Sequence, residues 1–184
     1  MKKYVLLAVL AASAASSLPA AAAIVSFSTV LSSAGEPVPT STATGSAWVT
    51  FDDLANTVTV NMNWAGLANA GPFGHIHCCT ANAFSGDASV LLNFGTLQAA
   101  TTGSLNSTYT VGVTPSFTQT RFNDILAGAR DGKAYVNIHT PGTYSGGEIR
   151  GFLRVPEPAS LALVALALGA AGVSARRKTA QPQA

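Results

Sequence analysis

The stretch from Thr57 to Trp64 alternates strictly between polar and apolar residues, and it constrains the fold more than any other part of the sequence. Val58, Val60 and the other apolar residues of this stretch line up on one side of an extended chain, with the polar residues on the other side. A helix would scatter the same side chains around its axis. We therefore expect a half-buried β-strand here.

The same period of two recurs along the chain. It predicts further strands at Trp48–Phe51, Val90–Phe94, Tyr109–Val113, Ala134–His139 and Ile149–Leu153. Pro141, Gly142, Gly146 and Gly147 lie between the last two segments, as a hairpin connection requires.

One segment has a helical period, because Phe122, Ile125 and Ala129 recur every three or four residues. We expect one short helix there, with Ser116 or Thr120 as its N-cap. Many short strands with polar turns and a single helix predict a mainly β domain. The expected architecture is an antiparallel β-sandwich or a small barrel.

The N-terminal segment, residues 1–23, has the three parts of an export signal. Lys2 and Lys3 precede an apolar stretch from Tyr4 to about Ala15, and small residues end the segment. The apolar stretch is shorter than the ~20 residues that cross a bilayer. We therefore predict a signal peptide that an export signal peptidase removes after Ala23, rather than a membrane anchor.

The C-terminal segment, residues 155–184, also has three parts. They are the motif Pro156-Glu157-Pro158, an uncharged apolar stretch at 159–175, and the basic cluster Arg176, Arg177 and Lys178. The apolar stretch reaches the lower end of the length range of transmembrane helices, and a basic cluster after a span holds that end in the cytoplasm. Physical reasoning alone thus predicts a transmembrane span at 159–175 that ends in a membrane stop, an ordinary tail anchor.

This tail resembles the PEP-CTERM sorting signal of Gram-negative bacteria that make exopolysaccharide. The resemblance implies that an exosortase-type enzyme cuts near Pro156, Glu157 and Pro158. It also implies that the protein stays in the inner membrane only transiently and then passes to the cell surface or the extracellular matrix. Exopolysaccharide or another surface component is the expected partner there.

The remaining segment, residues 24–154, has the size of a single domain. It contains five Lys and Arg residues against seven Asp and Glu residues, a net charge of −2, although the whole chain carries +2. The basic residues of the chain therefore belong largely to the two terminal signals. A nucleic-acid partner is not expected, because no basic patch is left to bind phosphates.

The three histidines of the chain are candidate metal ligands. His75 and His77 flank Ile76, so both imidazoles leave a strand on the same face. His139 has the same relation to its inward-facing neighbour Ile138. If the two strands are neighbours, the three imidazoles converge, and such a cluster suits copper or zinc.

Cys78 and Cys79 follow His77 directly and are the only cysteines of the chain. Adjacent cysteines can form a vicinal disulfide, pair between chains, or bind a soft metal ion. Export to an oxidising compartment favours the vicinal disulfide, which would fix the turn after the His-x-His strand.

Three blocks of this domain resemble the CHRD domain, first described in chordin and also found in bacterial envelope proteins. The blocks are residues 74–77, 134–140 and 146–153. In chordin the domain belongs to a secreted antagonist that binds growth factors. Cys78 and Cys79 stand where the family often has Gly or Pro, which implies a different turn after the His-x-His strand.

We expect a binding or structural protein rather than an enzyme, with a metal-binding envelope protein as the alternative. The His-x-His pattern is similar to the copper ligands of Cu,Zn superoxide dismutase, but a second cluster for a zinc subsite is missing from the sequence pattern. Glu148 and Arg150 share one face of the last strand. We interpret them as outward-facing residues with a structural role in cross-strand ion pairs, each of which contributes about 0 to 1 kcal/mol when exposed.

Overall fold

A computed structural model describes residues 24–36 and 40–156. The predicted signal peptide, Glu157 and Pro158 of the sorting motif, the span at 159–175 and the basic cluster from Arg176 to Lys178 lie outside the described residues. Within the described ranges, no helix is long and apolar enough to cross a membrane.

The domain is mainly β, as predicted, and its described residues form eight antiparallel strands in one sheet and one α-helix. The strands are β1 (Ile24–Ser32), β2 (Thr44–Asp52), β3 (Thr57–Ala65), β4 (Phe73–His77), β5 (Val90–Thr96), β6 (Gly103–Thr110), β7 (Tyr135–Thr140) and β8 (Tyr144–Phe152). A short 3-10 helix, η1 (Ser33–Gly35), follows β1, and α1 (Gln119–Arg130) precedes β7.

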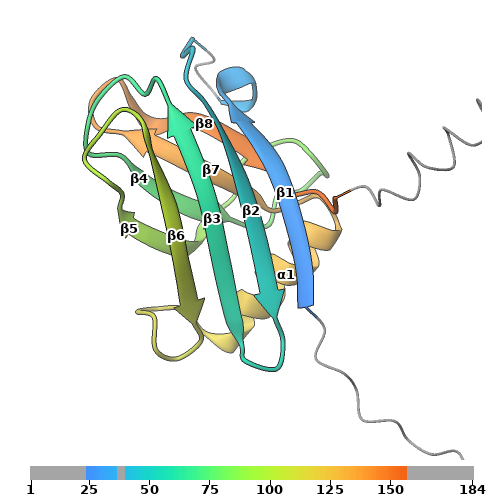
Figure 1. The fold of residues 1–184 in the computed structure, drawn as a ribbon. Coiled ribbons are helices and arrows are strands. Elements are labelled where there is room, and N and C mark those ends of the chain that lie inside the picture. The colour runs from blue at the N-terminus through green and yellow to red at the C-terminus, as the bar shows by residue number, and fades with distance from the viewer. Residues whose placement is uncertain (1–23, 37–39, 157–184) are drawn as a thin grey trace, which may run out of the picture.

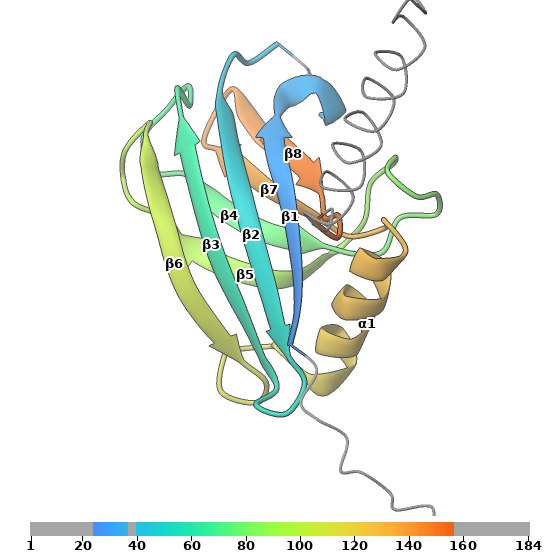
Figure 2. The ribbon, with the colours of Figure 1, turned by 45° about the vertical axis from the view of Figure 1, so that its right-hand side comes forward.

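The sheet has the strand order β5-β4-β7-β8-β1-β2-β3-β6 and curls into a half-barrel. Figures 1 and 2 show β1, β2, β3 and β6 in front, with β8, β7, β4 and β5 crossing behind them. The two halves join where Ser32 pairs with Arg150. At the open side, the rings of Phe94 on β5 and Tyr109 on β6 lie 5.5 Å apart. The arrangement combines the face-to-face packing of a sandwich with the continuous sheet of a barrel.

The core lies between the two halves and consists of the inward-facing residues of each strand. The alternation predicted for β3 is confirmed, because Val58, Val60 and Trp64 are buried while Asn61 and Asn63 are exposed. Each inward side chain loses its apolar surface from water, which stabilises the fold by about 25 cal/mol per Å².

The helix α1 covers one end of the half-barrel (Figure 2). Its buried face, which includes Phe122, confirms the predicted helical period, and the Phe122 ring packs edge-on against Phe51 of β2 at 5.6 Å. The N-cap is Thr118, whose hydroxyl accepts a hydrogen bond from the backbone N–H of Arg121 at 3.3 Å. The two expected caps were therefore wrong, one on each side of the actual one.

Two other expectations about the strands were incomplete or wrong. The sequence pattern did not identify β1, Ile24–Ser32, which directly follows the predicted signal peptide. The strand expected to reach Val113 ends at Thr110, and Val113 is 78 % exposed in the turn that follows.

Candidate metal centre

The candidate site lies on the outer face of the rear half of the sheet, on the neighbouring strands β4 and β7. The register places Phe73 opposite His139, His75 opposite Asn137, and His77 opposite Tyr135. Ile76, Val136 and Ile138 point into the core. The alternation therefore sends all three histidines to the same outer face, as expected for neighbouring strands.

The structure brings His75, His77 and His139 together, with one nitrogen atom of each ring within 4.8 Å of the others. The closest pair is Nδ1 of His75 and Nε2 of His139, which lie 3.1 Å apart. The ring centroid of His77 lies 5.5 Å from that of His75 and 5.9 Å from that of His139. In the described part of the chain, the cluster consists of histidines alone.

Two backbone carbonyls fix the orientation and the tautomer of two rings. Nδ1 of His77 donates to the carbonyl oxygen of Ala88 at 2.8 Å, and Nδ1 of His139 donates to that of Ser145 at 3.0 Å. Each Nε2 atom then carries a lone pair, which in His139 faces Nδ1 of His75 and in His77 has no hydrogen-bond partner among the described residues. Metal-bound histidines are held in this way by a hydrogen bond at the second nitrogen.

Two aromatic rings hold the same histidines from the side. Phe73 stacks on His139 with centroids 4.9 Å apart, and Tyr135 stacks on His77 at 4.7 Å. The planes in both pairs are nearly parallel, at 4° and 2°. Because a carbonyl and a stacking partner fix each of these two rings, His77 and His139 are preorganised.

The environment keeps the three imidazoles neutral. Burial lowers the pKa of all three, and the nearby His139 and His77 lower the pKa of His75 further, to about 4. Neutral imidazole is the form that binds metal ions. The Nε2 atom of His77 is buried and has no hydrogen-bond partner among the described residues. A buried acceptor without a partner is costly, and a bound ion would remove that cost.

The outer face next to the histidines is covered rather than solvated. Glu36, which follows η1, lies over Asn137, whose amide donates to its Oε1 at 3.1 Å. The other oxygen, Oε2, lies 4.0 Å from Nε of Arg150. Gly147 leaves the space for this carboxylate, because a Cβ atom there would overlap it. Burial, together with Asp87, raises the pKa of Glu36 to about 7 against the opposing effects of Arg150 and Asn137.

Glu148 and Arg150 share one face of β8, as expected, but neither is exposed. Both side chains are buried, and they bind different partners. Arg150 forms an ion pair with Asp87 at 2.6 Å and lies over the ring of Tyr135. Asp87 lies in a loop, and Tyr135 lies on the same face of the sheet as Arg150. Strand alternation shows on which face Arg150 lies, but it does not show that other residues cover that side chain.

Glu148 connects β8 to two loops. Its Oε1 atom accepts from the hydroxyl of Ser41 at 2.7 Å and from the backbone N–H of Ala68 at 2.9 Å. Its Oε2 atom accepts from the hydroxyl of Thr140 at 2.5 Å. The buried carboxylate is therefore satisfied by the buried hydroxyl of Thr140 and by two loop donors.

The cysteine pair lies beside the site but points away from it. Cys78 and Cys79 form a vicinal disulfide. Both sulfurs lie 3.4 Å from the carbonyl oxygen of Asp124 on α1. Gly128 of the same helix leaves the space that the sulfurs occupy. The disulfide thus joins the end of the His-x-His strand to the helix and does not take part in the histidine cluster.

Sequence reasoning identified the three histidines but none of the groups that orient them. The carbonyls of Ala88 and Ser145 carry no sequence signal, because every residue has a carbonyl. Phe73 and Tyr135 had a signal in the alternation of β4 and β7, since each shares the outer face with the histidines. Pro156 is the one residue of the sorting motif within the described part, and it lies far along the chain from this cluster.

The fold and the cluster define a curled β domain with an imidazole-only site on its outer face. The sequence profile of the CHRD domain matches residues 27–153, so the chain belongs to the CHRD domain family. Residues 154–178 match the PEP-CTERM protein-sorting motif. The protein is therefore an exosortase-sorted extracellular protein that is exported to the cell envelope or surface. No curated protein matches the chain.

Proposed function

We propose that this extracellular protein binds one copper or zinc ion through His75, His77 and His139. The observation that carries the proposal is the convergence of three ring nitrogens within 4.8 Å. Zinc binds histidine nitrogen at about 2.0 to 2.1 Å, so two ligands of one ion lie roughly 3 to 4 Å apart. Small rotations of the rings would bring the three nitrogens to these distances.

The donor set limits the choice of ion. Three neutral imidazoles suit zinc and copper, whereas magnesium and calcium prefer oxygen ligands. Neither a carboxylate nor a thiolate joins the cluster among the described residues. Three protein ligands leave at least one position of the ion for water or another small ligand.

A role outside catalysis is the second part of the proposal. A metal site that activates water usually has a carboxylate or another base next to the open position. Glu36 and Glu148 are the buried carboxylates of this face, and they bind Asn137, Ser41 and other structural partners instead. Metal-loaded protein should therefore show no hydrolase activity. Hydrolase activity that is lost on replacing His139 would contradict this part.

A second candidate function is association with exopolysaccharide at the cell surface or in the matrix. The sorting motif supports it by the location that it implies. A feature of the domain also favours association with exopolysaccharide. The outer face of the front half of the sheet is uncharged, and at its centre lies Trp48, which is 45 % exposed.

Metal analysis of untagged protein, recovered from its native host and identified by intact mass, tests the first proposal. We expect about one equivalent of copper or zinc per chain, and its loss on dialysis against a strong chelator. Chelated protein should take up one equivalent again. Less than about a tenth of an equivalent before and after addition of both metals would contradict the metal centre.

A further inference from the structure

We propose that the outer face of β1, β2, β3 and β6 is a binding site for a neutral polysaccharide, with Trp48 as its stacking platform. This face lies across the core from the histidines, so the inference is independent of the metal centre. It rests on the second candidate function, for which it names the surface and the chemical class of the ligand.

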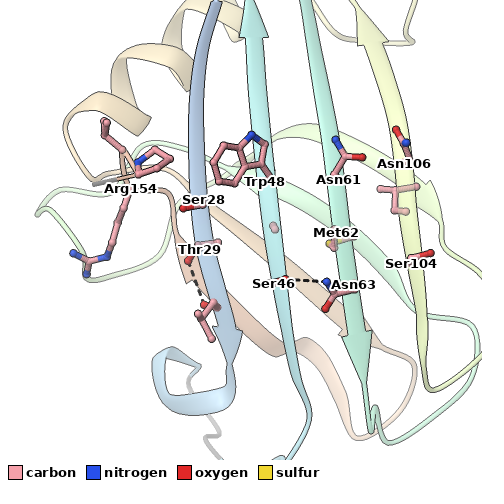
Figure 3. A pocket seen from close by; sticks show the side chains of 15 residues that line it. Ser28, Thr29, Ser46, Trp48, Asn61, Met62, Asn63, Ser104, Asn106 and Arg154 are labelled. Atoms are coloured by element: carbon pink, nitrogen blue, oxygen red, sulfur yellow. Dashed lines mark hydrogen bonds between the residues drawn. The ribbon is translucent and has the colours of Figure 1, made fainter. Parts of the chain in front are cut away.

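Strand register places Trp48 at the centre of a row of polar residues. Ser28 pairs with Trp48, Trp48 with Asn61, and Asn61 with Asn106. Figure 3 shows the side chains of Trp48, Asn61 and Asn106 at one level of three neighbouring strands. The row crosses four strands, which is about 14 Å at the usual strand spacing of about 4.8 Å.

Two flanking rows are polar as well, apart from the exposed Val30 that pairs with Ser46. On one side Ser26 bonds to Thr50 at 3.0 Å, and Thr59 bonds to Thr108 at 2.9 Å. On the other side Asn63 donates to Ser46 at 2.9 Å (Figure 3). These hydrogen bonds keep the flanking side chains close to the sheet, so the central row is left open between them.

The central amides are available to a ligand. Asn61 and Asn106 are both exposed, and neither side chain has a hydrogen-bond partner among the described residues. Each amide offers two donors and one acceptor. A pair of such amides next to an exposed indole suits a ligand with both hydroxyl groups and apolar C–H surface.

The face is nearly free of charge. The sequences of β1, β2, β3 and β6 contain one charged residue, Asp52, at the end of β2. Arg154 lies at the rim, and its guanidinium is placed over the ring of Phe84 at 4.0 Å. A nucleic acid or an acidic polymer would find no basic row here, because phosphate and carboxylate binding need Lys and Arg.

A neutral polysaccharide has the matching chemistry. The C–H faces of a sugar ring are apolar and pack on an aromatic ring, while its hydroxyls exchange hydrogen bonds with amide and hydroxyl side chains. The groove has a volume of about 790 Å³ and lies open along the sheet. An open, extended row of side chains with one aromatic platform fits a segment of a polysaccharide better than a small molecule, which needs an enclosed pocket.

A second copy of the protein is a weaker fit. A stable interface buries about 1,200 to 2,000 Å² and has an apolar centre. The large apolar residues exposed in this groove are Val30, Trp48 and Val155, and polar side chains separate them. Hydroxyl and amide side chains around them would lose water without gaining apolar contact.

The test uses the processed, full protein from its native host in affinity electrophoresis. The gels contain soluble β-glucan, mannan or galactan as neutral polymers, alginate as an acidic polymer, or the exopolysaccharide of the host. We expect retardation by at least one neutral polymer and none by alginate. Trp48→Ala should weaken the binding at least tenfold, Asn61→Ala combined with Asn106→Ala should weaken it severalfold, and Trp48→Phe should retain part of it.

Leu54→Ala is the matched control, because Leu54 is 76 % exposed in the turn between β2 and β3, outside the groove. It should bind like the unchanged protein, and removal of metal should have no effect. Circular dichroism checks that each variant is folded. The fluorescence of Trp48 gives a second readout, since the other tryptophan, Trp64, is buried.

Three results would overturn the inference. One is the absence of retardation by every neutral polymer, and another is retardation by alginate alone. The third is equal binding by Trp48→Ala and the unchanged protein. If both bind the host exopolysaccharide equally, the second candidate function stands while this site is wrong. If the protein binds no polymer but forms a dimer that Trp48→Ala dissociates, the face is an interface with a second copy of the chain.

Discussion

The Nδ1 atom of His75 lies 3.1 Å from the Nε2 atom of His139. Because His139 donates its Nδ1 proton to Ser145, its Nε2 atom is the acceptor, and His75 supplies the proton of this hydrogen bond. An ion at the site would replace that proton. His75 must then carry its proton on Nε2, so it is the ligand that has to change tautomer, while His77 and His139 are already prepared.

Because the ligands differ in this way, substitutions of His75 and His139 should have similar effects on metal affinity but different effects on stability. His75→Gln should lower copper or zinc affinity by about two orders of magnitude while changing the free energy of unfolding of the metal-free protein by less than about 1 kcal/mol, because His75 is partly exposed. His139→Gln should lower affinity similarly but cost about 1 to 3 kcal/mol, since the buried ring has a carbonyl partner and a stacking partner.

Competition with a chromophoric chelator measures the affinity, and urea denaturation in the presence of a chelator measures the stability. A His75→Gln variant that keeps full metal affinity would remove His75 from the ligand set. Replacement of His77 and His139 by alanine is less informative, because both side chains are buried and their loss would also affect the stability of the fold.

Glu36 predicts a pH dependence of stability. Its pKa is about 7 in the folded protein against 4.5 for an ordinary glutamate, mainly because it is buried. Between these pH values the folded protein binds more protons than the unfolded chain, so the free energy of unfolding falls as pH rises from about 4.5 to 7. Glu36→Gln removes this titration and should be more stable than the unchanged protein at pH 8, on the order of 1 kcal/mol.

Urea denaturation of both proteins at pH 5 and pH 8, with metal removed, measures the effect. The histidines contribute equally to both proteins, so their contribution cancels in the difference between the two. The same difference in stability at both pH values would show that Glu36 is ionised with an ordinary pKa.

Glu148 predicts a loss of stability. Glu148→Ala removes the acceptor of the buried Thr140 hydroxyl and of two loop donors, from the half-buried Ser41 and the exposed Ala68. A buried unsatisfied group costs about 1 to 3 kcal/mol, and we expect a loss of that size in urea denaturation. Glu148→Gln keeps one acceptor oxygen and should cost less. A change below about 1 kcal/mol for Glu148→Ala would mean that water reaches these donors.

The sequence predicted the convergence of the histidines because strand alternation is a local property. Each of His75, His77 and His139 follows or precedes a core residue, and this fixes the face on which it lies. The neighbouring position of β4 and β7 was a condition of that prediction, and the register meets it.

The covering of that face could not be predicted in the same way. Glu36 and Asp87 reach Arg150 from loops that are far away in the sequence, and no period relates them to the strand. Glu148 and Arg150 therefore looked like outward-facing, exposed residues. The N-cap of α1 was missed for a different reason, because Ser116, Thr118 and Thr120 all have suitable hydroxyls and only the backbone path selects Thr118.

The oxidation state of Cys78 and Cys79 stays a prediction, although the structure pairs them. Export to an oxidising compartment should leave the vicinal disulfide formed in the mature protein. Freshly isolated protein treated with an alkylating agent under denaturing conditions should therefore gain no mass. Two alkylated cysteines would show that the thiols are free.

The contact between this disulfide and α1 gives the last prediction. A Cβ atom on Gly128 would overlap both sulfurs, so Gly128→Ala should destabilise the oxidised protein by about 1 to 3 kcal/mol. Helix propensity alone predicts the opposite sign, a gain of about 1 kcal/mol for alanine over glycine. In a background with Cys78→Ala and Cys79→Ala the overlap is gone, and Gly128→Ala should then stabilise. The control Ala127→Gly, on the exposed face of α1, reports propensity alone and should cost about 1 kcal/mol in both backgrounds. If urea denaturation finds Gly128→Ala stabilising in the oxidised protein, the disulfide does not pack against the helix.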